Sequence, residues 1–377
     1  MKIGIDASIL ARKKITGINR YLQNLLKNIP EIDKKNEYYL FSFGESELSE
    51  YKIKGFNVIY VGKNKIISSK YYSAIWLNFA LPSALKKYKI DLFFQPNHFL
   101  PFFFDNKKIK SVITVHDLIP KIDPKYRDLI YKTYLNIFLP LSIKKSQKII
   151  TVSESSKKDI LKFYNVPAEK IYVIHEAADD KFKQRILSTE QKKKLISQYN
   201  LPEKFILHVG AIENRKNILG ILKIGDLIKN IDKNIKIVLV GKPGYGASEI
   251  FKEIEKCKNV YYIGHIDDED LPYIYNLAKL FLFPSFYEGF GLPPLEAMQS
   301  GLPTLASNTS SILEVVGEGG IIHDPRDYEG FAKDIINLLK NKNFYQEMQK
   351  KAISRAKDFS WKISTKKLIE VFNIYGK

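Results

Sequence analysis

Residues 283–298 of the chain read FPSFYEGFGLPPLEAM. The segment starts at the end of a short apolar run, passes Gly289 and Gly291, and reaches Pro293, a residue favoured in the first turn of a helix. A strand, a loop and a helix in that order form the repeating unit of an α/β fold. Free N–H groups at a helix start, together with the positive end of the helix dipole, bind phosphate. The segment therefore predicts a parallel strand followed by a phosphate site at the helix start near Leu292.

The alternation of short apolar runs with helical patterns continues on both sides of this segment. The first half predicts strands at 2–7, 38–43, 57–61, 91–95, 110–115, 148–152 and 170–174, with helices at 20–28, 72–88 and 129–146. The pattern then restarts, with strands at 205–209, 235–240, 260–264, 280–284 and 304–307 and helices at 187–200, 218–229, 247–257, 271–278, from about 293, and 328–340. This predicts the α/β class, with two Rossmann-like, doubly wound parallel-sheet domains facing a cleft. The expected domains are 1–180 and 181–360, and a final helix within 361–377 closes the chain.

Composition narrows the classes of protein that this chain can be. The 377 residues include 60 Lys or Arg and 41 Asp or Glu, a formal net charge of +19. The apolar share of 45% suits packed cores, and the single cysteine, Cys257, excludes an intrachain disulfide. The closest approach to a membrane span, 71–85, is broken by Pro82, and Asp6 makes the start unlike a secretory signal. We therefore expect a soluble, cytoplasmic protein whose charge excess attracts nucleic acid, an anionic membrane or phosphorylated small molecules.

Two carboxylates stand near the glycines of the opening segment. Glu288 lies in the loop and Glu296 lies eight residues later, in the first or second turn of the expected helix. Carboxylates beside a phosphate site cannot usefully bind the phosphate, but they accept hydrogen bonds from hydroxyls such as those of a sugar and a ribose. Each residue alone could equally be a helix cap or a solvated charge. Their occurrence together beside Gly289 and Gly291 favours a nucleotide-sugar site.

This Glu288 to Glu296 element resembles the nucleotide-sugar site of retaining glycosyltransferases of family 4, the glycosyl transferases group 1, which have the GT-B fold. Further segments resemble motifs of the family, in its order: IDAS and TGINRY (5–8 and 16–21), VHDL (115–118), TVSESSK (151–157), and VGA with RKN (209–211 and 215–217). The similarity covers nearly the whole chain. It implies that the N-terminal domain binds the acceptor and that the C-terminal domain binds the donor.

The resemblance also implies roles for individual residues. The expected donor site comprises Gly17, Arg215, Lys216, Glu288, Gly289, Phe290, Gly291, Leu292 and Glu296. Within it, Glu288 is expected to hold the sugar hydroxyls, Glu296 the ribose, and Lys216 with Arg215 the diphosphate. Gly17 is expected in a loop after the first strand that closes over the diphosphate. The expected catalytic residues are His116, Glu288 and Lys216, and the expected acceptor residues are His98, Asp117 and Arg20.

Several positions depart from the family pattern or have a simpler explanation. Ala211 stands where many relatives have an arginine, so the diphosphate clamp rests mainly on Lys216. Asn19 replaces a common glycine, and His175 with Glu176 replaces an N-G-V-D-like sequence, so no binding role is assigned to this turn. A histidine such as His98 could equally be structural, and Arg215 with Lys216 could be solvated charges.

The predicted activity is transfer of a sugar, mannose or a related hexose, from a UDP or GDP sugar to a hydroxyl of a glycan or lipid-linked glycan. The resemblance places this in bacterial surface polysaccharide synthesis, with retention of configuration, no cofactor and no metal. The aromatic loop Phe99–Phe104, followed by Lys107 and Lys108, suggests peripheral contact with an anionic membrane. The alternative is that this loop packs internally or against another subunit.

Other functions are less well supported. Asp268 to Asp270 match a metal-binding D-x-D pattern, but acids are also favoured just before a helix start. Residues 241–246 lack both the dinucleotide fingerprint and the P-loop arrangement. A nucleic-acid-binding protein would need basic and aromatic residues interleaved on one strand face, which we do not find. A nucleotide-sugar epimerase of the same fold is the nearest alternative, and it would form product without an acceptor.

Overall fold

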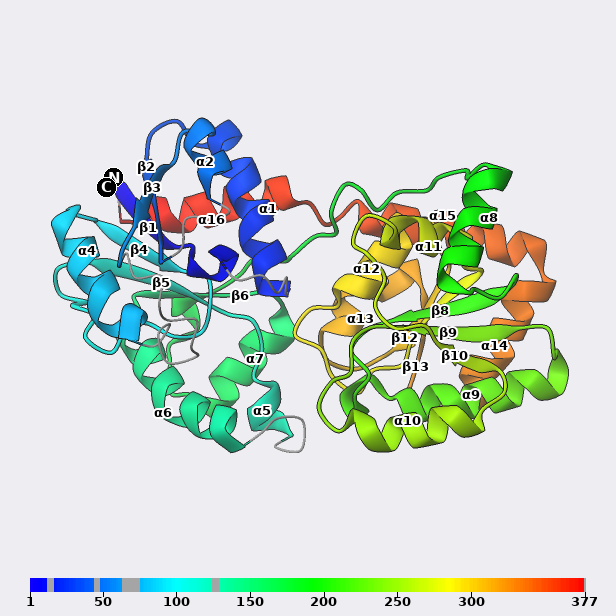
Figure 1. The fold of residues 1–377 in the computed structure, drawn as a ribbon. Helices are drawn as coiled ribbons and strands as arrows, with labels where there is room; N and C mark the ends of the chain where they lie inside the picture. Colours follow the sequence, from blue (N-terminus) through cyan, green and yellow to red (C-terminus); the bar gives the residue numbers. More distant parts are fainter. Residues whose placement is uncertain (12–16, 44–47, 63–74, 124–128, 376–377) are drawn as a thin grey trace. The chain divides into compact units, whose positions relative to one another are not determined.

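The computed structural model describes residues 1–11, 17–43, 48–62, 75–123 and 129–375, which divide into two compact units (Figure 1). Of these residues, 1–118, 129–176 and 361–375 form the first unit. The second unit consists of 177–360 and the short segment 119–123, which contains α5 (Ile119–Ile122). Among the described helices, none is both long and apolar enough to span a bilayer.

The first unit is built on a seven-stranded sheet with the order β3-β2-β1-β4-β5-β6-β7, and all its strand pairs are parallel. Its strands are β1 (Lys2–Asp6), β2 (Glu37–Ser42), β3 (Asn57–Tyr60), β4 (Leu92–Gln95), β5 (Lys110–Val115), β6 (Lys148–Thr151) and β7 (Ile171–Val173). The central strand β4 is buried along its whole length, because helices cover both faces of the sheet. The order reverses between β1 and β4, and such a reversal is where ligands bind in open parallel sheets.

Helices flank this sheet, with α1 and α16 on one face and α6 and α7 on the other (Figure 1). The helices of the unit are η1 (Ser8–Ala11), α1 (Gly17–Ile32), α2 (Ser49–Ile53), the π-helix η2 (Trp76–Ala80), α4 (Leu81–Lys87), α6 (Leu129–Lys145), α7 (Glu154–Phe163), η4 (Ala168–Lys170) and α16 (Trp361–Asn373). Gly17 is the first residue of α1, so the prediction that it lies in a loop was wrong. The preceding Thr16 and residues 72–74 of the predicted helix 72–88 lie outside the described residues.

The second unit has a six-stranded parallel sheet with the order β10-β9-β8-β11-β12-β13. Its strands are β8 (Phe205–Val209), β9 (Lys236–Val240), β10 (Val260–Tyr262), β11 (Leu280–Phe283), β12 (Thr304–Ser307) and β13 (Ile321–His323). Its other helices are α8 (Thr189–Tyr199), η5 (Asn214–Lys216), α9 (Ile218–Ile231), α10 (Ala247–Lys256), α11 (Leu271–Leu277), α12 (Leu292–Gln299), α13 (Ser310–Val316), η6 (Gly317–Gly319), α14 (Tyr328–Lys340) and α15 (Lys342–Ala356). The strand order reverses between β8 and β11.

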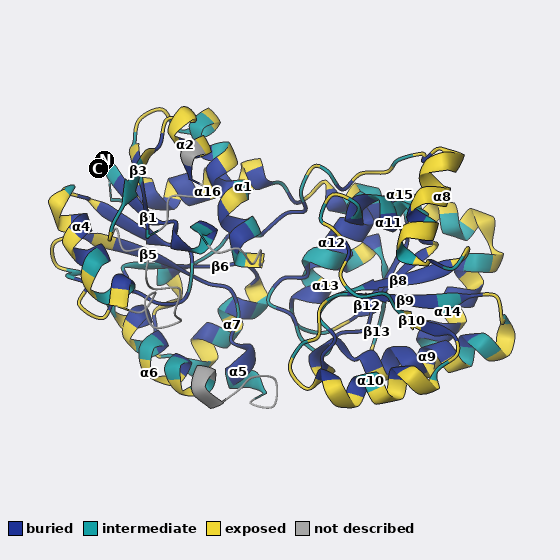
Figure 2. Cartoon of the chain, viewed as in Figure 1, coloured by how far each residue is buried: buried dark blue, intermediate teal, exposed yellow. Residues whose placement is uncertain are grey.

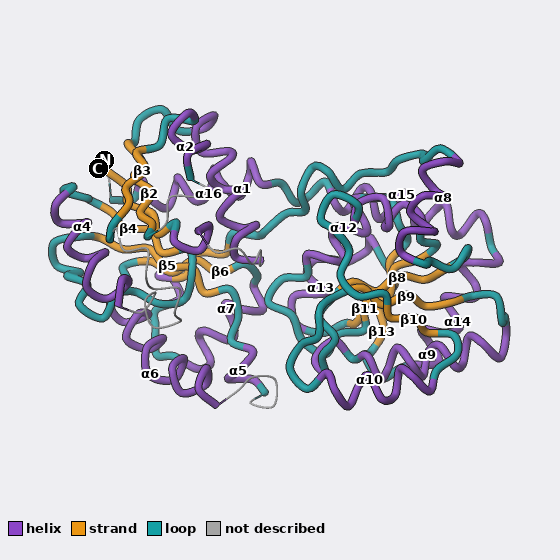
Figure 3. The backbone as a smooth tube through the Cα atoms, in the orientation of Figure 1, coloured by secondary structure: helices purple, strands orange, loops and turns teal. Residues whose placement is uncertain are grey.

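The core of the second unit follows from the apolar spacing of its elements. Helix α9 buries Ile221, Ile224 and Ile228, which recur every three or four residues and pack on the apolar strands β9 and β11. Figure 3 shows loops gathered at the edge of this sheet. The loops after the paired strands β8 and β11 lie side by side there, since the Phe286 N–H donates to the Arg215 carbonyl at 2.9 Å. Functional side chains from two distant parts of the sequence can therefore meet there.

Candidate functional site

The edge of the second sheet at its strand reversal carries the predicted donor residues. Strands β8 and β11 are neighbours and parallel, with Ile206 opposite Leu280. Arg215 and Lys216 follow β8 in the short helix η5, and Glu288 follows β11 in the next loop. The structure thus brings together three of the predicted site residues from separate strand-loop units.

These residues form a charged cluster, which we define as Glu213, Arg215, Lys216 and Glu288. The Glu288 carboxylate lies 2.7 Å from Arg215 Nη1 and 2.7 Å from Lys216 Nζ. Arg215 Nη2 donates a 2.6 Å hydrogen bond to Glu213 Oε1, and Nη1 donates to the Tyr287 carbonyl at 2.7 Å. All four charged side chains are at most 10% exposed, so the alternative that Arg215 and Lys216 are solvated charges does not hold.

Burial and pairing set the protonation of the cluster. Burial alone would raise the pKa of Glu288, but the adjacent Arg215 and Lys216 charges lower that pKa to about 2. Burial lowers the pKa of Lys216, although the Glu288 carboxylate opposes this effect. Glu288 is therefore ionised at neutral pH and retains a full negative charge beside two cations.

Two residues with left-handed backbone conformations hold the loops of the cluster. Asn217 has φ of 56°, and its Nδ2 donates to the Pro284 carbonyl at 3.0 Å and to the Pro325 carbonyl at 2.7 Å. Ser310 has φ of 48°, and its Oγ accepts a 2.8 Å hydrogen bond from the Glu288 N–H. Such conformations cost about 1–3 kcal/mol in residues other than glycine and cluster at functional sites. They fix the Glu288 loop by its backbone.

Packing also holds the Lys216 side chain in place. Its Nζ lies 4.8 Å from the centre of the Phe283 ring, and that ring stacks on His208 at 5.6 Å. A Cβ added to Gly210 would come within 3.3 Å of both Lys216 Cε and His208 Nε2, so a larger residue there would press on both side chains. Burial lowers the pKa of His208 to about 4, so His208 is neutral beneath the cluster.

The start of helix α12 offers fewer N–H donors than expected. Gly291, at φ of +118°, is the N-cap, and Leu292, Pro293 and Pro294 follow it. Because proline has no N–H, only Leu292 of these three positions can donate to an anion. Phe290 is 4% exposed and packs against Phe359, so its ring is part of the core and only its backbone can serve a ligand. The start of α12 therefore offers a phosphate fewer N–H donors than the sequence predicts.

Glu296 lies in the second turn of α12 and is 4% exposed. Its Oε2 accepts a 2.9 Å hydrogen bond from the Tyr275 hydroxyl, which comes from α11. The residue is thus neither a helix cap nor a solvated charge, which were the alternatives considered from sequence. Tyr275 fixes the direction in which this carboxylate points.

The first unit places its predicted histidines after neighbouring strands. His98 follows β4 and His116 follows β5, and their ring centroids lie 5.9 Å apart. His116 Nε2 lies 3.0 Å from the Pro96 carbonyl oxygen, and Nδ1 lies 3.4 Å from Glu176 Oε1. The Tyr21 ring, from α1, lies nearly perpendicular to the His116 ring, with the two ring centroids 4.8 Å apart. Both nitrogens of His116 therefore face acceptors supplied by the protein.

The two histidines differ in charge. Burial would lower the pKa of His116, but the Glu176 carboxylate and the Pro96 carbonyl raise it above its ordinary value. Burial lowers the pKa of His98 to about 4, and its buried Nδ1 has no hydrogen-bond partner among the described residues. His116 is therefore the more readily protonated member of the pair, and His98 is the neutral one.

The remaining predicted residues lie around these groups. Asp117 directly follows His116 and is half-buried, and Arg20 is half-buried in the first turn of α1. Gly17 is exposed at the start of α1. Asn19 is 3% exposed and its Nδ2 donates to the Ile9 carbonyl at 2.8 Å, so it anchors the start of α1.

Sequence reasoning missed several residues of both groups. Glu176 was dismissed because its surroundings depart from the family pattern, and Tyr275 carries no motif. Glu213 was not considered, although an acid two residues before Arg215 is a signal for an ion pair between them. Ser310 and Ser311 were also missed; Ser311 Oγ donates to the Glu288 and Phe290 carbonyls at 2.9 and 2.6 Å.

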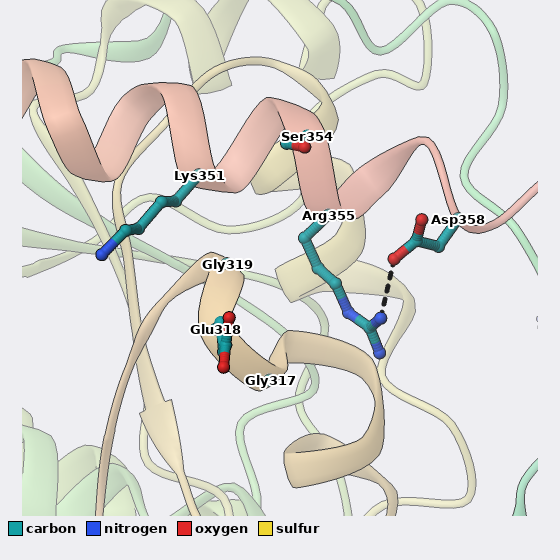
Figure 4. A pocket seen from close by; sticks show the side chains of 7 residues that line it. All are labelled: Gly317, Glu318, Gly319, Lys351, Ser354, Arg355 and Asp358. Carbon is teal, nitrogen blue, oxygen red and sulfur yellow. Dashed lines mark hydrogen bonds and ion pairs between the residues drawn. The ribbon is translucent and has the colours of Figure 1, made fainter.

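Two cavities of the second unit lie away from the charged cluster. One, of about 400 Å³, is lined by Gly317, Glu318, Gly319, Lys351, Ser354, Arg355 and Asp358 (Figure 4). Arg355 has a structural role there, because it donates hydrogen bonds to the Val315 and Glu314 carbonyls at the end of α13 and forms an ion pair with Asp358 at 2.7 Å. The other, of about 440 Å³, is lined mainly by lysines and apolar residues of β8, α14 and α15. Across the described residues, no three His, Cys, Asp or Glu side chains group as metal ligands would.

Comparison with known proteins assigns the family. The model of "Glycosyl transferases group 1" matches residues 189–357, and that of "Glycosyltransferase Family 4" matches residues 15–182. The two matches fall on the halves of the chain that carry the two sheets.

Individual relatives agree with these matches. The O-antigen chain mannosyltransferase B of Escherichia coli is 31% identical over 296 residues, which cover 77% of this chain and 76% of that protein. The serotype-specific mannosyltransferase WbdA of E. coli is also 31% identical, over 71% of this chain, but the chain spans only 34% of its length. The crystal structure of Anabaena Alr3699/HepE in complex with UDP and glucose has a TM-score of 0.71 and 17% identity, over 99% of both chains. The chain belongs to the family 4, group 1 glycosyltransferases, which have the GT-B fold.

Proposed function

We propose that this glycosyltransferase moves a hexose, mannose in the first instance, from a nucleoside-diphosphate sugar to a hydroxyl of a glycan or lipid-linked glycan, with retention of configuration. The observation that supports it most is the buried charged cluster at the strand reversal of the second sheet. The names of the E. coli relatives support mannose and surface polysaccharide synthesis, and the UDP and glucose in the Anabaena structure support a nucleotide sugar.

In this proposal, Lys216 and Arg215 bind the diphosphate. A lysine ammonium has three N–H donors and a guanidinium has five, so contact with Glu288 leaves each cation donors that can reach phosphate oxygens. Both cations are already fixed by packing and pairing, and little ordering is needed when the donor binds. Glu288, which stays ionised at neutral pH, accepts hydrogen bonds from the sugar hydroxyls, and Glu296 with Tyr275 holds the ribose.

The proposed chemistry needs no covalent bond between sugar and protein. The acceptor hydroxyl oxygen attacks the anomeric carbon on the face from which the diphosphate leaves, and the bond between that carbon and the phosphate oxygen breaks. The acceptor proton passes to the leaving phosphate oxygen. Negative charge grows on the diphosphate as it leaves, and Lys216 with Arg215 stabilises that charge. We propose that the reaction needs neither a cofactor nor a metal.

The donor assignment is tested by measuring the thermal stability of the protein with GDP, UDP, GDP-mannose and UDP-hexoses, and then transfer from the stabilising sugar to a lipid-linked acceptor. We expect one nucleotide series to raise the melting temperature, and Lys216→Met to abolish that increase. The anomeric configuration of the product, read by proton NMR, tests retention. The proposal is overturned if no nucleoside diphosphate binds, or if the sugar changes configuration on transfer.

We further propose that the first unit contacts an anionic membrane carrying the acceptor. Of the aromatic loop, Phe99 and Phe104 are buried, whereas Phe102 and Phe103 are 48% and 55% exposed. The Phe103 ring lies 5.1 Å from Phe102 and 5.0 Å from Phe79, which is 61% exposed. We call Phe79, Phe102 and Phe103 the aromatic patch.

Helix α6 extends the aromatic patch with apolar and basic residues. Figure 2 shows exposed positions along α6. Ile137 and Leu141 of this helix are exposed and four residues apart, and Lys145, four residues further on, has its Nζ 5.3 Å from the Phe102 ring centre. Residues 75–110 and 129–145 together hold nine lysines and two aspartates. Exposed apolar side chains surrounded by cations are typical of proteins that bind at the surface of an anionic membrane.

A further inference from the structure

Glu176 is the buried acid of the first unit for which neither the sequence pattern nor the proposed function supplies a role. It is 6% exposed, and its Oε1 lies 3.4 Å from His116 Nδ1. A buried carboxylate is costly unless it is paired, and His116 is the partner that the structure gives it. The Glu176 and His116 side chains therefore form a buried pair and not a chance contact at the protein surface.

The contacts of His116 define where its protons lie. A carbonyl oxygen accepts but cannot donate, so the 3.0 Å contact of Nε2 with the Pro96 carbonyl requires a proton on Nε2. The Glu176 carboxylate at Nδ1 is likewise an acceptor, and an unprotonated Nδ1 would set two lone pairs against each other. The arrangement is satisfied when both ring nitrogens carry protons and the ring is an imidazolium.

We propose that Glu176 is a positioning residue, which holds the His116 ring by Nδ1 and keeps both of its nitrogens protonated. The other groups that face this ring are Tyr21 from α1, His98 after β4 and the adjacent Asp117. His98 is neutral and adds no competing charge, and Asp117 adds a second, weaker attraction for the proton. Glu176 is thus the main source of the charge on His116.

The C-terminal helix holds Glu176 where this role needs it. The Ser364 hydroxyl of α16 donates a 2.6 Å hydrogen bond to the carbonyl of His175, the residue before Glu176. Trp361, at the start of α16, contacts Tyr21 at 6.0 Å, and Tyr21 in turn contacts His116. Both sides of the His116–Glu176 pair are therefore supported by the last helix of the chain.

The consequence for transfer rests on the proposed function. A fixed imidazolium carries its positive charge before the reaction starts and does not have to gain a proton during it. Without Glu176, the pKa of the ring falls, because burial disfavours its charged form and the main opposing group is lost. Loss of Glu176 is then expected to change the pH dependence of transfer and not merely its maximum.

The experiment measures the protonation of His116 directly, by NMR of the intact protein labelled at the histidine rings. The six histidines give six ring signals, and His116→Gln identifies the relevant one. In Glu176→Gln we expect the titration midpoint of His116 to fall by about one pH unit or more. In Glu176→Asp, which keeps a carboxylate, we expect a midpoint between those of Glu176→Gln and the unaltered protein. The control is Glu169→Gln, which removes an exposed carboxylate of the same unit and should leave the midpoint unchanged.

A midpoint of His116 that is the same in Glu176→Gln and in the unaltered protein would overturn the proposal, as would an equal fall in Glu169→Gln. Circular dichroism of each variant establishes that it is folded. Because the ring titration needs no substrate, it stands even if the transferase proposal fails. Conversely, normal ring titration with no sugar transfer would count against the proposed function alone.

Discussion

At the scale of single residues, the donor site is an arrangement of buried charges whose members depend on one another. Glu288 receives hydrogen bonds from both Arg215 and Lys216, and Arg215 is also paired with Glu213. Removing one member of a buried ion pair typically costs about 3–5 kcal/mol, because the other charge is left unpaired. A truncation such as Glu288→Ala removes both the charge and the packing of this side chain, whereas Glu288→Gln removes the charge and keeps the shape.

We predict that Glu288→Gln keeps the binding of the nucleoside diphosphate but lowers sugar transfer by a factor of about 10² to 10³. The amide retains the shape of the side chain, while Arg215 and Lys216 lose the carboxylate that competes with the phosphate. Titration calorimetry with the diphosphate and initial rates with the sugar donor measure the two effects. A matched control is Glu318→Gln, an exposed acid of the same unit. If diphosphate binding and transfer fell together, Glu288 would be a structural partner of the cations rather than a ligand of the sugar.

How much of the site could be predicted differs from residue to residue. The grouping of Glu288 with Arg215 and Lys216 follows from the sequence, because residues after neighbouring parallel strands meet at one edge of the sheet. The pairing of Glu176 with His116 does not, because it depends on where the chain runs after β7 and on its anchoring to α16. The number of free N–H donors at the start of α12 was also not predictable. Pro293 and Pro294 remove donors from the first turn only because the helix begins at Leu292, which the structure shows.

At the scale of elements, strands with continuous apolar runs were predicted well, whereas some short or serine-rich elements were missed. Strands β5 and β8 have the predicted bounds, since both are almost entirely buried and bounded by polar residues or a glycine. Strand β13 was missed because it has three residues, all half-buried, at the edge of the sheet. Helices α7 and α13 were missed because both start with serines, which are typical of loops. In α7, Ser153 is the N-cap, and its side chain accepts a hydrogen bond from the Ser156 N–H.

Helix α16 shows how tertiary structure decides the role of an element. The sequence predicts it as a closing helix, and the structure assigns it to the first unit, where its buried residues include Leu368 and Phe372. Phe372 is fully buried and its ring lies 5.3 Å from Phe94 of β4. The last helix thus completes the core of the unit in which the chain begins.

We predict that Phe372→Ala destabilises the first unit by about 3–5 kcal/mol, because it leaves a cavity against β4. Both tryptophans of the chain, Trp76 and Trp361, are buried in this unit, so tryptophan fluorescence during urea unfolding reports on it specifically. Lys366→Ala, at an exposed position of the same helix, should change the stability by less than about 0.5 kcal/mol. Equal unfolding curves for Phe372→Ala and Lys366→Ala would show that α16 contributes little to this core.

At the scale of the whole molecule, the net charge of +19 remains larger than the donor site requires. The charged cluster uses two cations and pairs them with two acids, so it contributes no excess. The surface around the aromatic patch, by contrast, carries lysines that outnumber acids in the segments that form it. The total charge predicts a general attraction for anions, whereas the position of lysines around the aromatic patch favours a specific membrane-binding surface.

Because a charge of +19 attracts any anionic surface, binding to vesicles does not by itself test the aromatic patch. We predict that the unaltered protein floats with vesicles rich in anionic lipid at low salt. It should keep part of its binding at about 0.5 M salt, because salt screens charge attraction but not the insertion of phenylalanine rings into the bilayer. Replacing Phe102 and Phe103 by serine should weaken binding about tenfold or more, because each buried phenylalanine contributes roughly 1.5–3 kcal/mol. The matched control replaces Ile231 and Leu313, two exposed apolar residues of the second unit, and should bind as the unaltered protein does. Equal flotation of both double variants would contradict the membrane proposal, and a dimer that dissociates only when Phe102 and Phe103 are replaced would assign the patch to a second copy of the chain instead.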